Sequence, residues 1–166
     1  MIRPARLDDI PALIAIELAS GELFGALGMT AVDEDPPLSA EEFGHFVGAG
    51  RSFVQANGHD HPTAYILLEP LDGHLFVQQV TVSPESARQG LGAQLLDFAQ
   101  DRASEFGMHG LSLTTFRDVY WNAPYYSRLG FEIVGESDLT PGLASKLQDE
   151  SSRGLAAWPR VAMRRD

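Results

Sequence analysis

The chain has 166 residues, of which 44% are hydrophobic and 21% charged, a composition typical of a folded globular domain rather than a disordered chain. It has no cysteine, which excludes a disulfide, a thiolate zinc site and a cysteine acyl-enzyme. Twelve Lys and Arg against 23 Asp and Glu give a net charge of −11, which would repel nucleic acid and weakly favours cationic partners. No apolar stretch is long enough to cross a membrane and the first six residues are unlike a signal peptide, so we expect a single cytoplasmic domain over residues 1–166.

The amino-terminal half of the sequence predicts a strand, two helices and three further strands. Residues 2–7 favour a strand, and Asp8 or Asp9 can cap the helix that follows. Five apolar residues are expected on the buried side of that helix, namely Ile10, Leu13, Ile14, Ile16 and Leu18. Ser39 and Glu42 make a capping box for a second, short helix. Runs rich in β-formers at residues 52–56, 64–71 and 75–82, the last two joined by an Asp-Gly turn, then predict three antiparallel strands.

The carboxy-terminal half alternates between helices and strands. Apolar residues recur at helical spacing over residues 90–105, and a glycine just beyond them is a typical left-handed stop. A strand at 110–115, a short helix at 123–129 and a strand at 131–134 follow. Residues 137–154 are polar and patternless, although Pro141 could begin a helix. Residues 158–164 predict an edge strand, a position that tolerates Pro159.

The most informative segment passes from the strand at 75–82 through a tight turn into the helix at 90–105. Gly90 and Gly92 allow close backbone approach, and the first amides of a helix have no internal partners, so this turn can cradle a pyrophosphate. A tight contact between helix and sheet would explain the same glycines. The dinucleotide-binding pattern fails because position 95 is leucine and the preceding strands look antiparallel. The P-loop pattern fails because no Gly-Lys-Ser or Gly-Lys-Thr follows the turn.

The segment Ala87-Arg88-Gln89-Gly90-Leu91-Gly92 resembles the acyl-CoA-binding motif of the GNAT acetyltransferases, in which a strand is followed by [Q/R]-x-x-G-x-[G/A]. Ala87 departs from that motif, and this departure should weaken one side-chain contact while leaving the main-chain amides in place. The resemblance implies that acetyl-CoA is bound by residues of the strand and the turn. These residues are Val80, Val82, Arg88, Gln89, Gly90, Leu91, Gly92 and Ala93.

The segment from Trp121 and Asn122 to Phe131 resembles the second motif of the same family, A-x-x-[FY]-Y-x-x-x-G-F. The resemblance implies that Tyr126 lies near the CoA sulfur, where a phenol can protonate the departing thiolate. It also implies that Asn122 contacts the pantetheine arm. Tyr125 and Tyr126 could instead be packing aromatics, but two motifs in the order of the family favour the functional interpretation.

The general base is the part of this chemistry that the sequence leaves open. Relatives often place a glutamate on the strand before the first motif, whereas this chain has Gln78 and Gln79, which cannot accept a proton. A water relay, an acceptor that arrives neutral, or a carboxylate from the first helix region would serve instead, and we favour Glu22 over Glu17. An ordinary solvated carboxylate is the competing interpretation of Glu22. Further candidates are the five histidines, His45, His59, His61, His74 and His109.

The resemblance implies an α/β (α+β) fold of the GNAT type, with a mixed, mostly antiparallel sheet of about six or seven strands and about four helices. It implies an N-acetyltransferase that moves the acetyl group of acetyl-CoA directly to a primary amine of a small molecule or peptide. A catalytically inactive CoA-binding or interaction module of the same fold is the alternative, motivated by the two glutamines. We expect no metal, because His59 and His61 stand in a turn without a supporting cysteine. Nucleic acid and membranes are not expected as partners, and a homodimer is left open.

Overall fold

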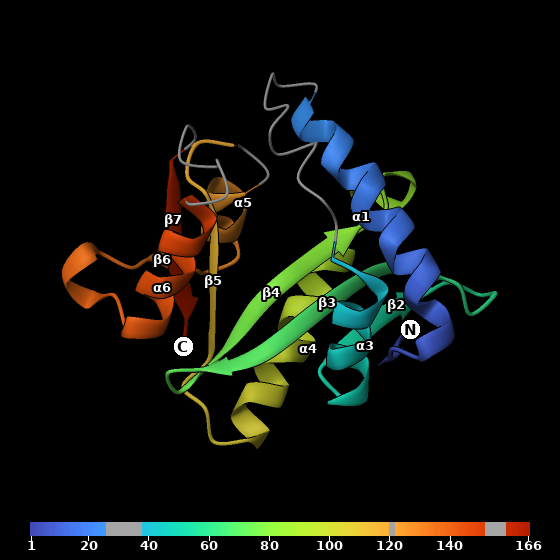
Figure 1. Cartoon of the computed structure of the whole chain (residues 1–166), viewed down its shortest axis with the longest axis horizontal. Coiled ribbons are helices and arrows are strands. Elements are labelled where there is room, and N and C mark those ends of the chain that lie inside the picture. Colours follow the sequence, from blue (N-terminus) through green and yellow to red (C-terminus); the bar gives the residue numbers. More distant parts are fainter. Residues whose placement is uncertain (26–37, 120–121, 152–158) are drawn as a thin grey trace. The chain divides into compact units, whose positions relative to one another are not determined.

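The computed structural model describes residues 1–25, 38–119, 122–151 and 159–166. Its seven strands form one mixed sheet in the order β1-β2-β3-β4-β5-β7-β6 (Figure 1). The chain divides into two compact units, Met1–Leu68 with Gln78–Phe98 and Glu69–Val77 with Ala99–Asp166. In the part of the chain described here, no helix is long and apolar enough to cross a membrane.

The first unit contains the amino-terminal elements and the turn predicted to bind pyrophosphate. It is built from β1 (Ile2–Pro4), the 3-10 turn η1 (Leu7–Asp9), α1 (Ile10–Gly25), α3 (Ala40–Gly48), β2 (Ser52–Ala56) and most of β3 (Pro62–Leu71). The second part of β4 (His74–Val82), η2 (Pro84–Ser86) and the first part of α4 (Leu91–Glu105) complete it. The strands β1, β2 and β3 pair antiparallel.

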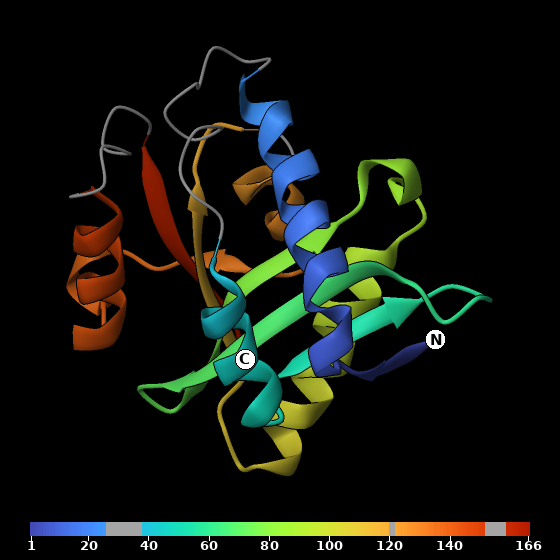
Figure 2. The same ribbon diagram turned by 45° about the vertical axis from the view of Figure 1, so that its right-hand side comes forward.

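The side chains of β2 alternate between the two faces of the sheet, and both faces are packed in the first unit. Val54 joins a buried cluster with Leu13 of α1, Phe43 of α3 and Tyr65 of β3, so α1 and α3 cover one face of these strands (Figures 1 and 2). Its neighbour Phe53 points the other way, as the two-residue period of a strand requires, and its ring lies 4.8 Å from that of Phe98 on α4. The side chain of Gln55 follows Phe53 and donates to that of Gln94 on α4. α1 and α3 therefore lie on one face of β2, and α4 lies on the other.

The second unit is organised around β5 (Leu111–Phe116) and β7 (Arg160–Arg165), which pair antiparallel along their whole length. The start of β4 runs parallel to β5, and this pairing is limited to Leu75 with Leu111 and Phe76 with Ser112. Three further elements complete the unit, namely α5 (Ala123–Arg128), β6 (Glu132–Ile133) and α6 (Pro141–Glu150). The core below α6 joins Phe76, Val134, Leu143 and Ala162.

Most predicted elements are present within one or two residues of the expected bounds, and the Asp72-Gly73 turn joins β3 to β4. The capping box of α3 is also confirmed, because Glu42 N donates to Ser39 Oγ and Ser39 N to the Glu42 carboxylate. Five α-helices are described, against about four expected. Trp121 of the second motif and Trp158, where the last strand was expected to begin, lie outside the described residues.

Three expectations need correction or completion. The last strand is not an edge strand, since β7 lies between β5 and β6. Pro159 is compatible with that position because it precedes the strand, and its carbonyl accepts a hydrogen bond from Arg117 N. Leu18 is 51% exposed and does not share the buried side of α1. The polar segment at 137–154 contains α6, which the hydroxyl of Thr140 caps by accepting from Leu143 N.

Candidate functional site

The turn between β4 and α4 has the backbone geometry of an anion cradle. Arg88 and Gly90 both adopt left-handed conformations, with φ of 66° and 74°. The first internal bond of α4 runs from Gln94 N to Gly90 O, so the amides of residues 91–93 precede the hydrogen-bonded turns of the helix. The first turn of α4 contains no acidic side chain. An anion bound at this turn would therefore receive hydrogen bonds from unpaired amides, fit the left-handed turn and lie at the positive end of the helix macrodipole.

The surface of this turn is accessible. Arg88, Gln89 and Gly90 are exposed, and a Cβ added to Gly90 would meet nothing within 4 Å. Gly90 is therefore not explained by tight packing against the sheet, whereas Gly92 is buried and tight packing, the competing interpretation, still accounts for it. Two reasons remain for a glycine at position 90. One is its left-handed φ, and the other is that a ligand must approach the backbone closely there.

The end of β4 is connected to α1 by hydrogen bonds. Val80 and Val82 are half-buried, and the carbonyl of Val82 accepts from the hydroxyl of Ser20 at 3.2 Å. One helical turn earlier, Glu17 accepts at Oε1 from Gln79 Nε2 at 2.8 Å and at Oε2 from Leu38 N at 3.2 Å. Two anchors one turn apart hold the same side of α1 against this strand.

The sequence candidates for the base differ in their surroundings. Glu22, the preferred one, is exposed, whereas Glu17 is half-buried and held by two hydrogen bonds. Gln79 itself accepts from the hydroxyl of Tyr65 at 2.7 Å. Tyr65 could not be identified from the sequence, because a tyrosine inside a predicted strand has no local signal that distinguishes a polar contact from core packing.

In the second unit, Tyr126 lies on α5 between two other rings. Its ring centroid is 5.4 Å from that of Tyr125 and 5.7 Å from that of Phe131, both in edge-to-face geometry. Burial, with a smaller effect of Tyr125, raises the pKa of the Tyr126 hydroxyl above its ordinary value. The phenol is therefore protonated throughout the physiological range and can donate a proton but not accept one.

Asn122 precedes α5 and presents a fixed amide. Its Oδ1 accepts from the hydroxyl of Thr115 on β5 at 2.6 Å. Its buried Nδ2 has no hydrogen-bond partner among the described residues. A buried donor without a partner is destabilising by itself, so this amide fits a ligand carbonyl or hydroxyl that completes the bond. Thr115, which orients it, was not identified from the sequence.

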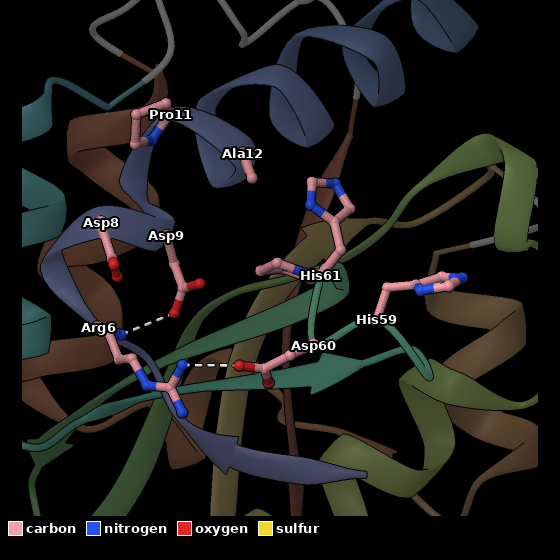
Figure 3. Close-up of a pocket in the computed structure, with 9 residues that line it drawn as sticks. Arg6, Asp8, Asp9, Pro11, Ala12, His59, Asp60 and His61 are labelled. Carbon is pink, nitrogen blue, oxygen red and sulfur yellow. Dashed lines mark hydrogen bonds and ion pairs between the residues drawn. The ribbon is translucent and has the colours of Figure 1, made fainter.

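The histidine pair His59 and His61 lines a separate open hollow of about 580 Å³ at the start of α1 (Figure 3). The two rings point in different directions, and the aspartate between them, Asp60, pairs with Arg6 and Arg3 at 2.7 Å each. Within residues 1–25, 38–119, 122–151 and 159–166, no group of three or more His, Cys, Asp or Glu side chains could hold a metal ion.

The sequence matches one known protein family. The family described as "Acetyltransferase (GNAT) family" matches residues 13–131. That range contains the turn, Glu17, Gln79, Asn122 and Tyr126.

Three similar solved structures share the fold. N-acetylglutamate synthase from Neisseria gonorrhoeae, complexed with coenzyme A and N-acetyl-glutamate, has a TM-score of 0.72 at 18% identity, with 99% of this chain and 34% of that chain covered. PaiA N-acetyltransferase from Thermoplasma acidophilum, in complex with coenzyme A, also has 0.72, at 15% identity, with 100% and 98% covered. The ribosomal-protein-S18-alanine N-acetyltransferase from Escherichia coli has 0.65 at 20% identity, with 99% and 91% covered.

The chain spans about a third of the synthase and nearly all of the other two proteins. At these identities the likeness shows a common GNAT fold. The family match is broader evidence, because it runs over well more than half of the sequence and includes both motifs. The chain therefore belongs to the GNAT family of acetyltransferases.

Proposed function

We propose that this protein transfers the acetyl group of acetyl-CoA directly to a primary amine of a small molecule or peptide. The observation that carries the proposal is the family match over residues 13–131, which includes both the amide cradle before α4 and the tyrosine of α5. The match draws on both compact units, and this supports one catalytic domain rather than two independent ones. The three similar structures are named as N-acetylating enzymes, and two of them hold coenzyme A, which supports an amine acceptor.

The residues of the cradle fit a pyrophosphate. The amides at the start of α4 would bind its oxygens, the exposed guanidinium of Arg88 would add a screened charge, and Val80 and Val82 would lie along the pantetheine. Asn122 Nδ2 would give its unused donor to the same arm. Acetyl-CoA, when bound, supplies an acetyl group activated as a thioester.

Each side chain then has a defined task in the transfer. With no cysteine available for an acyl-enzyme, direct attack of the amine on the thioester carbonyl is the default route. Tyr126, whose pKa is raised by burial, is protonated at neutral pH, so it can deliver a proton to the departing sulfur. The acceptor must lose a proton before it attacks, and the carboxylates of α1, Glu22 and Glu17, are our candidates to receive it directly or through water.

A thiol-release assay with acetyl-CoA and a panel of amines tests the function, with mass spectrometry to identify the acetylated product. We expect release that depends on the amine. If the protein binds CoA by calorimetry but turns over with no amine and with no component of a metabolite extract, it is an inactive binding module and the proposal is wrong.

Replacing Tyr126 by phenylalanine tests the proposed acid. The ring contacts with Tyr125 and Phe131 are kept, so we expect a loss of about 10²-fold in kcat with little change in acetyl-CoA affinity. Tyr125→Phe is the matched control on the same helix and should leave kcat within a few-fold of the wild type. Equal losses of binding and turnover in Tyr126→Phe would indicate a packing role.

A further inference from the structure

A continuous chain of hydrogen bonds connects three side chains of the first unit. The Tyr65 hydroxyl on β3 donates to Gln79 Oε1 on β4, and Gln79 Nε2 donates to Glu17 Oε1 on α1, at 2.7 and 2.8 Å. The backbone amide of Leu38 donates to the second oxygen of the same carboxylate. The Glu17 carboxylate is thus held directly by β4 and by the backbone at Leu38, and indirectly by β3 through Gln79.

The orientation of the central amide follows from its partners. An ionised carboxylate only accepts hydrogen bonds, so the NH2 group of Gln79 must face Glu17 and its oxygen must face Tyr65. Tyr65 is then the donor, and it stays protonated because burial and the charge of Glu17 raise the pKa of its hydroxyl. Thr81 makes a further hydrogen bond to the same hydroxyl. All these roles are consistent only when position 79 is an amide.

A glutamate at position 79 would have a different effect. Its carboxylate would lie within hydrogen-bond distance of Glu17, and two adjacent carboxylates cannot both ionise at neutral pH without a large penalty. Gln79 therefore has a role beyond the absence of a base. Where a glutamate would place a second negative charge beside Glu17, the glutamine places an NH2 donor that holds the Glu17 carboxylate in position.

Glu17 is also better placed than Glu22 to act beside the proposed cofactor strand. At 3.6 residues per turn, an offset of five positions turns the side chains of Glu17 and Glu22 about 140° apart, onto different sides of α1. Ser20, one turn after Glu17, is bonded to Val82 at the end of β4. Glu17 is half-buried, so its carboxylate is held against β4 without being sealed in the core.

The charged groups on the elements packed against α1 are mostly exposed or paired. The ionisable residues of these elements are Asp8 and Asp9 of η1, Glu41, Glu42 and His45 of α3, Glu85 of η2, Tyr65 and Glu69 of β3, and His74 of β4. Tyr65 is neutral, and Asp8, Glu41, Glu42, His45 and Glu85 are exposed to solvent. Asp9 pairs with Arg3 at 2.8 Å, Glu69 pairs with Lys146, and His74 pairs with Asp166 at 2.7 Å.

We propose that Glu17 is the carboxylate that receives a cationic alkylamine acceptor and takes one proton from its ammonium group, with Gln79 and Tyr65 as positioning residues. This inference rests on the proposed function and narrows its substrate class to amines that are protonated at neutral pH. The ammonium N–H proton passes to a Glu17 oxygen and then to solvent. The nitrogen keeps the electron pair, with which it forms the new bond to the acetyl carbon. The C–S bond then breaks, its electron pair leaves on the sulfur, and the sulfur is released as the thiol of coenzyme A with a proton from Tyr126, while the nitrogen loses its second proton as the amide forms.

The experiment compares two classes of acceptor in the thiol-release assay. An alkylamine with a pKa near 10 is only about 10⁻³ neutral at pH 7 and needs a base, whereas an arylamine with a pKa below about 5 is already neutral. Glu17→Gln should lower kcat/KM about 10²-fold for alkylamines and by no more than about threefold for arylamines. Its pH profile for an alkylamine should rise tenfold per unit and follow the neutral fraction of the amine.

The positioning residues are tested by Gln79→Met and Tyr65→Phe with the same two classes of amine. Tyr65→Phe retains the ring that packs 5.6 Å from Phe43. Each should give a smaller loss than Glu17→Gln, again confined to alkylamines. Glu41→Gln, which removes an exposed carboxylate from α3, is the matched control and should match the wild type for both classes.

Each outcome decides between the alternatives. Equal losses for alkylamines and arylamines, or a pH profile of Glu17→Gln that superimposes on the wild type, would overturn the role of Glu17. A shifted profile in Glu22→Gln instead would assign the proton to Glu22. Absence of thiol release with every amine in the wild-type protein would reject the proposed function, and this role with it.

Discussion

The strongest test of the amide cradle uses two glycines at opposite ends of α4. Gly90 precedes the helix with φ of +74°, and Gly107 follows it with φ of +70°. A Cβ added at either position would meet nothing within 4 Å. Replacing each by alanine therefore introduces the same backbone strain without a steric clash inside the protein.

The size of that strain follows from the left-handed conformation. An L-residue pays roughly 1–2 kcal/mol there, and alanine recovers about 0.5–1 kcal/mol because its unfolded state is more restricted than that of glycine. The net loss is about 1 kcal/mol for each variant, or about 2–4 °C in Tm for a chain of this size. The two variants should be nearly equal in thermal and urea unfolding.

Coenzyme A binding should separate the two variants. At Gly90 the new methyl group would stand where a pyrophosphate must approach the backbone, so we expect a loss of affinity of tenfold or more, about 1.4 kcal/mol, by calorimetry. Gly107→Ala should bind CoA as the wild type does. Gly90→Asp adds a negative charge at the cradle and should abolish binding. Equal CoA affinities of Gly90→Ala and Gly107→Ala would refute the assignment of the cradle.

Other features of the structure give further predictions. Asp9→Asn should destabilise the fold by about 1–3 kcal/mol in urea unfolding at pH 7, because Arg3, only 8% exposed, would lose its buried charged partner and keep only the more exposed Asp60. The bond from Arg3 lowers the pKa of Asp9, so the wild type should keep this advantage above pH of about 4 and lose it as the pH falls further. A difference that persists undiminished at pH 2 would contradict this. Gly110→Ala should lose about 3 kcal/mol or more, because its Cβ would lie 2.2 Å from the carbonyl oxygen of Arg165; a Tm near that of the wild type would show that the carboxy terminus yields. Arg88→Ala should weaken CoA binding modestly at low salt and hardly at all at high salt, measured by calorimetry at two ionic strengths.

Features encoded by neighbouring residues were predictable from the sequence. The capping box of α3, the Asp72-Gly73 turn and the glycine that begins α4 depend on residues within a few positions of one another, so their patterns are visible before folding. The left-handed φ of Arg88 was not predicted, since arginine has no special preference for that conformation.

Features that depend on the pairing of distant segments were not predictable. The position of β7 between β5 and β6 requires a return of the chain across the sheet, and Pro159 suggested an edge. The hydrogen bonds from Tyr65 through Gln79 to Glu17 depend on the alignment of β3 with β4 and on the rotation of α1 about its axis. From the sequence, the two glutamines indicated only a missing base.

The cradle also provides a position for a fluorescent probe of ligand binding. Gln89 in the cradle is exposed and the 166-residue sequence has no cysteine, so Gln89→Cys would introduce its single thiol. A fluorophore attached there would sit one residue before Gly90 and respond to occupancy of the turn without labelling any other position. For the same reason the unlabelled protein contributes no background to thiol detection, and every thiol that appears in an assay comes from the cofactor.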